Sequence, residues 1–322
     1  MTARFRVVVT DVRHPSFDEE RGVLGEIGAE LVLADCATAE QVAEACRDAD
    51  GVLANLAPVT AAAIAAMTRC RVISRYGVGC DSVDVAAATG RGIWVGYVPN
   101  YCAEDVSDHA LALLLAVTRR VAQKDRSVRA GHWNAPCGKI HRLEGKAFGL
   151  IGFGRIARAL SRKLAAFRPS RILAHDPQQD AEAIAAGGAV KAELGELLRE
   201  SDYISLHAPA SADTKGLLGR EAMSAVKPGA VIINTSRGSL IDEDALIAAL
   251  ERGAIAGAGL DVFVHEPLAA DHGLRRFDQV VLTDHAAWYS EESMVELKTT
   301  AARNVAAVLA GGRPLHCVNE LR

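Results

Sequence analysis

The sequence predicts an α/β protein with two parallel sheets, each covered by helices on both faces. Three observations predict this class. The chain has 322 residues, more than a single hydrophobic core usually supports, so two domains are expected. Its hydrophobic content is 50% and consists mainly of aliphatic residues and alanine, which favours helix-covered parallel strands over a sandwich. Short apolar runs alternate with amphipathic helical stretches along the chain, as in doubly wound sheets.

The first hundred residues predict a compact α/β unit of their own. The expected strands cover residues 5–9, 31–33, 51–54, 71–74 and 93–95. Capping-box spacing, Ser16 with Glu19 and Thr38 with Gln41, predicts where the first two helices begin. A long helix is then expected from residue 103 to about residue 130, because apolar residues recur on one face at positions 106, 110, 113, 114 and 117. We expect this helix to bridge the two domains.

A second α/β unit follows, and the C-terminal helix is expected to return to the first. The predicted strands are residues 146–151, 172–174, 203–206, 230–234, 256–261 and 280–283. A last helix, about residues 291–309, stops at Gly311, Gly312 and Pro314. The predicted domains are therefore residues 1–101 with 290–322, which is discontinuous, and residues 102–289.

A glycine-rich turn between the strand at 146–151 and a helix at 155–167 is the most informative motif. Residues 149–157 read Gly-Leu-Ile-Gly-Phe-Gly-Arg-Ile-Ala, which is typical of a dinucleotide-binding βαβ unit. Gly152 allows the tight turn, Gly154 allows a pyrophosphate to approach the backbone, and Ala157 takes the tolerated third position. Asp176 is expected to accept hydrogen bonds from an adenosine ribose and to repel a 2′-phosphate, so NAD is favoured over NADP. The alternative is an ordinary strand-to-helix turn with a surface aspartate.

Three polar residues follow the last three strands of the second unit. They are Arg237, Glu266 and His285. Because ligands bind at the carboxyl ends of parallel strands, these side chains are expected to meet in one crevice. A guanidinium that grips a carboxylate, and an imidazole supported by a carboxylate, are the groups that reduction of a 2-oxo acid requires. Each alone is also explained by a surface ion pair, a loop carboxylate or a strand-end histidine. His265 is expected to point into solvent, since neighbours in an extended segment point oppositely.

Composition argues against several other classes. The chain has 36 basic and 40 acidic residues and no basic stripe with interleaved aromatics, so nucleic acid is not an expected partner. Seven cysteines without C-x-x-C spacing favour reduced thiols and a cytoplasmic protein. We expect no leader peptide and no membrane span, since no apolar run reaches eighteen residues. The histidines and cysteines show no metal-ligand spacing, and no metal is expected.

Together these motifs resemble the D-2-hydroxyacid dehydrogenases over nearly the whole chain. The resemblance implies a Rossmann NAD-binding domain at residues 102–289, inserted into a flavodoxin-like substrate-binding domain, and it implies NAD as cofactor. It makes Arg237, Glu266 and His285 the catalytic residues. The expected cofactor-binding residues are Gly152, Gly154, Arg155, Ile156, Asp176, His207, Ala208, Pro209, Thr235, Asp261 and His285, with Asp261 at the nicotinamide carboxamide. The expected substrate-binding residues are Arg75, Tyr76, Gly77, Val78, Gly79, Arg237 and Trp288, with backbone N–H groups of the loop at 76–81 holding the substrate carboxylate.

Residues 285–293 are similar to the branch that contains the C-terminal-binding proteins, which are transcriptional corepressors. Trp288 either walls the substrate pocket or packs between the domains. Several positions depart from the family pattern: Ala157 replaces glycine, Ser236 and Ser239 replace small residues beside Arg237, and Asp284 stands where proline is common. A carboxylate at Asp284 is expected to favour the protonated form of His285.

The predicted function is NAD-dependent interconversion of a 2-oxo acid and a D-2-hydroxy acid. The alternative is an NAD(H)-binding interaction or corepressor-like protein with weak dehydrogenase activity. Biosynthetic phosphoglycerate dehydrogenase is a third possibility with little support, because we expect neither a regulatory domain nor a second basic residue in the loop beyond Arg75. The resemblance also implies a homodimer paired through residues 120–144, where basic side chains gather. The sequence leaves the substrate open, since side-chain selectivity depends on residues such as Asn55, Leu56, Tyr101 and Trp288.

Overall fold

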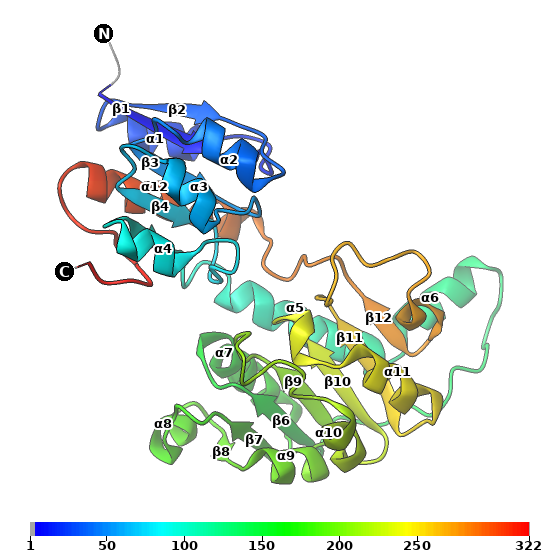
Figure 1. The fold of residues 1–322 in the computed structure, drawn as a ribbon. Coiled ribbons are helices and arrows are strands. Elements are labelled where there is room, and N and C mark those ends of the chain that lie inside the picture. Colours follow the sequence, from blue (N-terminus) through cyan, green and yellow to red (C-terminus); the bar gives the residue numbers. More distant parts are fainter. Residues whose placement is uncertain (1–3, 322) are drawn as a thin grey trace. The chain divides into compact units, whose positions relative to one another are not determined.

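A computed structural model describes residues 4–321 of the chain. The chain forms two compact units (Figure 1). The first consists of the described part of Met1–Tyr101 and Ser290–Arg322, and the second is Cys102–Tyr289. The C-terminal helix thus belongs with the N-terminal strands.

The first unit contains a parallel five-stranded sheet in the order β2-β1-β3-β4-β5. This is a flavodoxin-like strand order, so the predicted fold of this unit is confirmed. The strands are β1 (Phe5–Val9), β2 (Ala29–Leu33), β3 (Gly51–Ala54), β4 (Val72–Arg75) and β5 (Trp94–Gly96). The helices are α1 (Asp18–Gly25), α2 (Ala39–Ala45), α3 (Ala61–Ala66), α4 (Val85–Gly90) and α12 (Glu291–Leu309).

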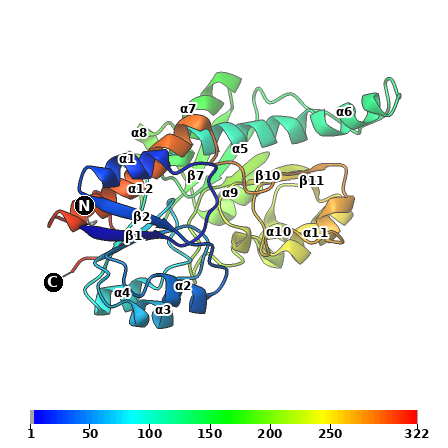
Figure 2. The ribbon, with the colours of Figure 1, turned by 90° about the horizontal axis from the view of Figure 1, so that it is seen from above.

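Helices cover both faces of this sheet. Figure 2 shows α1 and α12 on one side and α2, α3 and α4 on the other. The close approach of α12 depends on small residues in the strands, because a Cβ atom at Gly51 would lie only 2.7 Å from Cγ1 of Val305. On the opposite face, apolar side chains such as Val52 and Ile73 pack with Ile64 of α3 in a fully buried cluster.

One of the two predicted capping boxes forms. Thr38 accepts from the backbone N–H of Gln41, and the Gln41 side chain accepts from the N–H of Thr38, so the start of α2 is confirmed. The box predicted at Ser16 and Glu19 is wrong, since α1 begins at Asp18 after Phe17, which makes no side-chain cap. The physical reason is a buried lysine of α12. Lys298 Nζ donates to Ser16 Oγ at 3.3 Å and forms an ion pair with Glu19, so both side chains are engaged away from the helix end.

The second unit contains a parallel seven-stranded sheet in the order β12-β11-β10-β9-β6-β7-β8. Successive strands are added to one side of β6 as far as β8, and then to its other side from β9 to β12. The topological switch point of this Rossmann sheet therefore lies between β6 and β9. The strands are β6 (Ala147–Ile151), β7 (Arg171–His175), β8 (Val190–Lys191), β9 (Tyr203–Leu206), β10 (Ala230–Asn234), β11 (Ile255–Leu260) and β12 (Val280–Leu282). Six of these strands were expected from the sequence, and the two-residue β8 was not.

Two apolar cores lie on the two faces of this sheet. Successive residues of β6 alternate between them, because Leu150 packs with one core and Ile151 with the other. One core involves α5 (Ala103–Thr118), α7 (Arg155–Leu164) and α8 (Ala181–Ala186), and the other involves α9 (Leu194–Glu200), α10 (Arg220–Ala225) and α11 (Glu243–Glu251). Short 3-10 turns occur at Ala165–Phe167, Gly238–Leu240 and Gly273–Arg276. The predicted doubly wound fold is confirmed.

The expected long helix is wrong in one respect, because it breaks at Arg120. Arg120 adopts a left-handed conformation with φ of 57°, and α6 (Val121–Arg129) begins after it. The predicted apolar face of α5 is buried through Val117 and Thr118, whereas α6 has no buried residue. Figure 2 shows α6 extending beyond the sheet. The helix ends where its buried face ends, and Arg120 Nη2 donates to the carbonyl of Ala256 at 3.0 Å.

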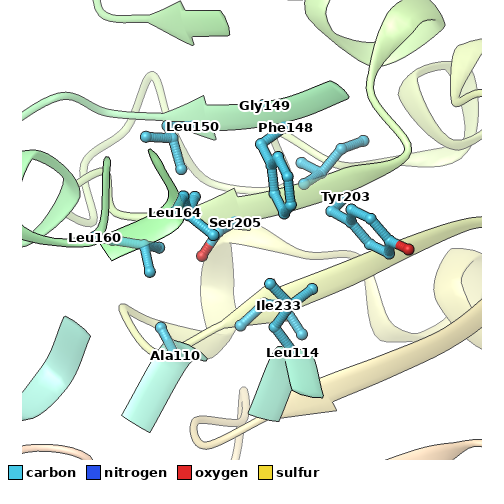
Figure 3. Close-up of a pocket in the computed structure, with 11 residues that line it drawn as sticks. Ala110, Leu114, Phe148, Gly149, Leu150, Leu160, Leu164, Tyr203, Ser205 and Ile233 are labelled. Atoms are coloured by element: carbon cyan, nitrogen blue, oxygen red, sulfur yellow. The ribbon is translucent and has the colours of Figure 1, made fainter. Parts of the chain in front are cut away.

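A small void lies in the core of the second unit (Figure 3). Side chains of α5, α7, β6, β9 and β10 line it, and its volume is about 10 Å³. This is at the lower limit for one water molecule, so the void belongs to the packing of the core. Within residues 4–321, no helix is both long and apolar enough to cross a membrane.

Candidate active site

The glycine turn lies after β6, at the switch point of the second sheet. Gly152 has φ of 83°, and a Cβ atom there would lie 2.6 Å from the backbone nitrogen of Ala208. Only glycine fits both the conformation and the contact. A Cβ atom at Gly154 would meet nothing within 4 Å, so the backbone at the start of α7 is open. Arg155 is exposed and Ile156 is half-buried in the first turn of this helix.

Asp176 follows β7 and is tied to the glycine turn. Its Oδ2 accepts from the backbone N–H of Phe153 at 2.8 Å, and its Oδ1 accepts from the N–H of Gln178 at 2.9 Å. A carboxylate has about four lone-pair sites, so these two bonds leave capacity for further donors. The half-buried carboxylate is thus held at the place where a ribose is expected.

The loops after β9 and β10 lie on the other side of the switch point from the glycine turn. Burial lowers the pKa of His207 to about 4, so this imidazole is neutral at physiological pH, and its Nε2 lies 2.9 Å from Ser205 Oγ. Ser236 Oγ donates to the carbonyl of Ala208 at 2.5 Å, which joins the two loops. Thr235 Oγ1 is buried and has no hydrogen-bond partner in the described part of the chain.

These features fit a dinucleotide. An open helix start, a glycine cradle, a positioned carboxylate and a buried hydroxyl without a protein partner are the groups that such a cofactor would engage. Pro209, in the same loop as Ala208, is exposed.

Arg237 is placed by the glycine that follows it. A Cβ atom at Gly238 would lie 1.9 Å from the carbonyl carbon of Phe263 and 2.4 Å from the nitrogen of Val264. The loop after β10 therefore packs directly on the loop after β11. The half-buried Arg237 donates from Nη1 to the carbonyl of Ser236 at 2.8 Å. Glycine after arginine is thus required by the contact between the two loops.

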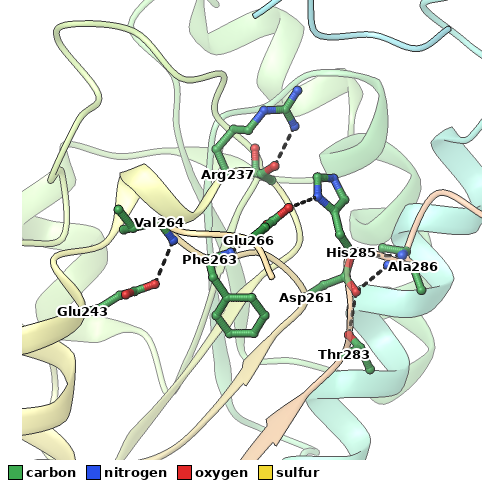
Figure 4. Close-up of polar contacts among 11 residues, drawn as sticks. Arg237, Glu243, Asp261, Phe263, Val264, Glu266, Thr283, His285 and Ala286 are labelled. Carbon is green, nitrogen blue, oxygen red and sulfur yellow. Dashed lines mark hydrogen bonds and ion pairs between the residues drawn. The ribbon is translucent and has the colours of Figure 1, made fainter. Parts of the chain in front are cut away.

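Glu266 and His285 form an acid and imidazole pair (Figure 4). His285 Nδ1 lies 2.7 Å from Glu266 Oε2, and Glu266 Oε1 accepts from the N–H of Phe263 at 2.9 Å. Desolvation raises the pKa of Glu266, but the hydrogen bonds from His285 and Phe263 and the charges of His285 and Arg237 outweigh it, so the net pKa is lowered. Glu266 is therefore ionised at neutral pH and can stabilise an imidazolium.

Asp261 holds the turn that carries His285. Its Oδ1 accepts from the N–H of Ala286 at 2.9 Å and from Thr283 Oγ1 at 2.6 Å, and its Oδ2 accepts from the N–H of Ala287 at 3.0 Å. His285 adopts φ of 60°, which is rare for a residue with a side chain, and its N–H donates to the Asp261 carbonyl at 2.8 Å. The carboxylate is buried. Its contacts in the structure thus involve the turn at His285, and the expected nicotinamide contact stays a prediction.

A second carboxylate positions the Glu266 loop, and the sequence did not point to it. Glu243 is the first residue of α11. Its Oε1 accepts from the N–H of Val264 at 2.9 Å, and its Oε2 lies 3.2 Å from His272 Nε2. The N-cap residue Asp242 marks the helix start in the sequence, but the target of Glu243 lies 21 residues away. Only the tertiary structure brings them together.

In the first unit, the loop after β4 is anchored by Tyr76. The Tyr76 side chain is 2% exposed, and its hydroxyl donates to Glu20 Oε1 at 2.9 Å. Lys298 Nζ lies 3.7 Å from the other oxygen of Glu20. The N–H of Tyr76 donates to the carbonyl of Ala54 at 2.8 Å, so both the hydroxyl and the N–H of this residue are engaged within the first unit.

The rest of this loop is glycine-dependent. Gly77 has φ of +133°, and the Arg75 guanidinium occupies the space that a side chain at Gly77 would need. The N–H of Gly77 donates to the carbonyl of Arg75 at 3.0 Å. The N–H groups of Val78 and Gly79 have no acceptor among residues 4–321. Both donors are therefore available for a carboxylate.

The remaining candidates are neighbours of Glu266 and His285 in the sequence. His265 is exposed, as expected, and Asp284 is exposed next to His285. Trp288 is half-buried and meets the ring of Tyr289 edge-on at 5.7 Å, which leaves both interpretations of Trp288 open. In the described residues, no group of three or more histidine, cysteine, aspartate or glutamate side chains could hold a metal ion.

Comparison with known proteins agrees with this geometry. Residues 111–287 match the family model of the D-isomer specific 2-hydroxyacid dehydrogenase NAD-binding domain. A glyoxylate reductase of Thermofilum pendens is 38% identical over 288 residues, which are 87% of this chain and 84% of that protein. A D-3-phosphoglycerate dehydrogenase of Mycobacterium leprae is 38% identical over 265 residues, 82% of this chain but 50% of that protein.

A solved structure extends the match to the whole fold. The crystal structure of D-lactate dehydrogenase from Aquifex aeolicus, complexed with NAD and lactic acid, superposes with a TM-score of 0.84 at 27% identity and covers 95% of this chain and 96% of that one. Enzymes with named reactions thus match most of the chain, which favours an oxidoreductase over a binding module. The affinity to the C-terminal-binding-protein branch stays a prediction. The chain belongs to the D-isomer-specific 2-hydroxyacid dehydrogenase family, whose members use a nicotinamide cofactor to interconvert 2-oxo and 2-hydroxy acids, and it is an oxidoreductase of that kind.

Proposed function

We propose that this enzyme reduces a small 2-oxo acid with NADH, and that His285 donates the proton, Glu266 stabilises the protonated imidazole and Arg237 binds the substrate carboxylate. The observation that carries the proposal is the 2.7 Å contact between His285 Nδ1 and Glu266 Oε2, beside the charge of Arg237. A bound nicotinamide supplies the hydride for this chemistry.

The proton is held at Nε2 of His285. Because Nδ1 faces an ionised carboxylate, it carries a proton in both the neutral and the charged imidazole. The second proton of the imidazolium is therefore on Nε2, from which it is given to the carbonyl oxygen as the 2-hydroxy acid forms. In the reverse direction, the same Nε2 lone pair accepts the hydroxyl proton. Glu266 stabilises the charged form in both directions.

Carboxylate binding is assigned to a cation and to backbone donors. The guanidinium of Arg237 presents paired N–H groups that match a carboxylate, and the contact of Gly238 with Phe263 keeps it beside the acid and imidazole pair. In the first unit, the N–H groups of Val78 and Gly79 are the corresponding candidates, and Arg75 adds a positive charge to their loop.

The cofactor preference is assigned to NAD because of Asp176. Its carboxylate is fixed by Phe153 and Gln178 at the end of β7, where a 2′-phosphate would add a second negative charge. The rest of the proposed cofactor contacts involve the glycine turn, the loop from His207 to Pro209 and Thr235.

Glyoxylate is the proposed substrate among small 2-oxo acids. The support is the 38% identity to a glyoxylate reductase over most of both chains, whereas the phosphoglycerate dehydrogenase match spans half of that enzyme.

The test is NADH consumption with glyoxylate, hydroxypyruvate, pyruvate, phosphohydroxypyruvate and 4-methylthio-2-oxobutyrate, repeated with NADPH. We expect turnover with NADH and glyoxylate, and a loss of roughly two to four powers of ten in kcat for His285→Ala with NADH binding retained. His265→Ala, which changes an exposed histidine outside the proposed dimer segment, is the control. Tight NADH binding without turnover on any of these acids, or full activity of His285→Ala, would contradict the proposal.

We also propose that the enzyme is a cytoplasmic homodimer paired through α6 and the segment after it. Val121, Val128 and Trp133 there are 54%, 51% and 80% exposed, an unusual amount of apolar surface for one short segment. All seven cysteines are free in the structure, which supports a reducing compartment. Sedimentation of the wild type and of Trp133→Asp tests the pairing, since a dimer that is unaffected by this charge would place the interface elsewhere.

A further inference from the structure

His109 of α5 is joined to the catalytic turn through two side chains from other elements. Its Nε2 lies 2.9 Å from Oγ1 of Thr283, which follows β12. Thr283 Oγ1 in turn lies 2.6 Å from Oδ1 of Asp261, which follows β11. The His109 side chain is 24% exposed and the Asp261 carboxylate 1%. Since α5 packs against β11 and β12, the three side chains form one chain of hydrogen bonds inside the second unit.

The proton positions in this chain follow from the number of donors. Both oxygens of Asp261 accept backbone N–H groups, from Ala286 and Ala287, as a carboxylate does. The single hydroxyl proton of Thr283 is therefore donated to Asp261, and its oxygen is left as an acceptor. His109 Nε2 must then carry a proton and donate it to Thr283. The same Nε2 lies 3.5 Å from Asp261 Oδ1, so it also faces the buried negative charge.

These hydrogen bonds stabilise the turn at His285. That residue adopts φ of 60°, a conformation that is unfavourable for a residue with a Cβ atom. The turn persists because the Asp261 carboxylate accepts from the N–H groups of Ala286 and Ala287, and the Asp261 carbonyl accepts from the N–H of His285. The orientation of the Asp261 carboxylate therefore sets the direction of the His285 imidazole toward Glu266. Figure 4 shows Asp261 between Thr283 and the His285 turn.

We propose that His109 is a positioning residue of the reaction: through Thr283 it fixes the rotamer of Asp261, and Asp261 fixes the strained turn that presents His285. The inference rests on the proposed role of His285 as proton donor. It gives His109 a role that its place on α5 does not suggest, because the residue touches neither Glu266 nor His285.

The test compares variants that keep or remove the donor at Nε2. His109→Leu fills similar space without a donor, and His109→Gln keeps an N–H donor at nearly the same position. Ala112→Leu changes an exposed position of the same helix and serves as the control. Steady-state kinetics with NADH and glyoxylate are measured across pH, together with NADH binding and thermal unfolding.

We expect His109→Leu to lower kcat by roughly 10- to 100-fold, the effect of a shift of about 1 Å in a reacting group. The KM for glyoxylate and NADH binding should change much less, and the pH profile of kcat should shift, because His285 no longer faces Glu266 in the same way. His109→Gln should recover most of the rate. Thr283→Val, which removes the middle hydroxyl at constant shape, should match His109→Leu and replaces it if that variant does not fold.

The inference is overturned if His109→Leu and Thr283→Val keep the wild-type rate and pH profile. It is also overturned if His109→Gln loses as much as His109→Leu while both melt at lower temperature, since that pattern indicates packing alone. His285→Ala is measured in the same series. Full activity of His285→Ala would contradict the proposed function itself. If His285→Ala is inactive and His109→Leu is fully active, only the role of His109 is contradicted.

Discussion

A methyl group on Gly238 is the smallest change that should separate the proposed catalytic groups from one another. In Gly238→Ala the new Cβ atom would lie 1.9 Å from the carbonyl carbon and 2.2 Å from the oxygen of Phe263. Ordinary contacts of a Cβ atom begin at 3.4 Å. The two loops must therefore move apart by about 1.5 Å, the difference between 3.4 Å and the 1.9 Å to the carbonyl carbon. Both obstacles are backbone atoms, which cannot rotate away as a flexible side chain would.

This displacement should be felt mainly in activity. Phe263 donates its N–H to Glu266, so a moved loop carries Glu266 away from His285, while Arg237 moves with Gly238. A misplacement of about 1 Å can cost a factor of about 100 in rate, so we expect kcat/KM to fall by about that factor or more, equivalent to about 3 kcal/mol. Overpacking should also lower the free energy of unfolding by about 1–3 kcal/mol.

The assay is NADH oxidation with glyoxylate, combined with NADH binding and thermal unfolding. Gly22→Ala is the matched control, since a Cβ atom at this helical glycine meets nothing within 4 Å and should leave activity unchanged. If Gly238→Ala has wild-type kinetics and unfolds at the wild-type temperature, then the close packing of the two loops does not position the site and our reasoning is wrong.

Three further predictions concern single carboxylates. Glu266→Gln should move the pH profile for reduction to lower pH, because the protonated imidazole of His285 loses its negative partner; an unmoved profile contradicts the pairing. In the wild type, the pKa of Glu266 is lowered in the folded state, so its contribution to stability is present above the ordinary carboxyl pKa and is lost as the pH falls through the lowered value. The free energy of unfolding of the wild type should therefore fall with decreasing pH by more than that of Glu266→Gln. The same fall at acid pH in both proteins would contradict this contribution of Glu266. Asp176→Ala should narrow the preference for NADH over NADPH by at least an order of magnitude, roughly 1.4 kcal/mol, measured as the ratio of the two kcat/KM values, and an unchanged ratio would mean that Asp176 does not select the cofactor.

Local patterns in the sequence predicted those features that depend on neighbouring residues. The capping box of Thr38 and Gln41 formed because its partners lie three residues apart. The glycine turn was recognisable because a strand, two glycines and a helix occur in one short segment. The two sheets followed from apolar runs whose order along the chain admits few topologies.

The errors arose where a distant residue competes for a local one. Ser16 and Glu19 have the spacing of a capping box, but Lys298, more than 270 residues away, binds both. The break at Arg120 likewise reflects the end of the surface on which α5 packs, since the sequence itself continues with good helix formers. The same limit applies to the proposed site, where Glu243 and His109 contact the loops after β11 and β12 from separate helices.

A common device holds the loops at the carboxyl ends of the strands in both units. Each of three aspartates that follow a strand accepts two backbone N–H groups: Asp11 after β1, Asp176 after β7 and Asp261 after β11. For Asp11 and Asp261 both N–H groups belong to the loop after a neighbouring strand, and for Asp176 one of the two does. Parallel strands end together at this edge, so the loops there expose N–H groups that no strand partner satisfies. A short carboxylate placed just beyond a strand can accept two of them at once and fix the loops against each other.

This device changes how an aspartate at such an edge is interpreted. From the sequence alone, an aspartate after a strand of a nucleotide-binding sheet is assigned to a ligand, as Asp176 and Asp261 were. Asp11 makes the same kind of contacts, with the N–H groups of Asn55 and Leu56, although no motif marks it. Ligand binding and loop anchoring are therefore compatible roles of one carboxylate. Replacing any of the three is expected to loosen a loop as well as to remove a ligand contact, so a binding constant measured on an Asp→Ala variant needs the isosteric Asp→Asn variant beside it.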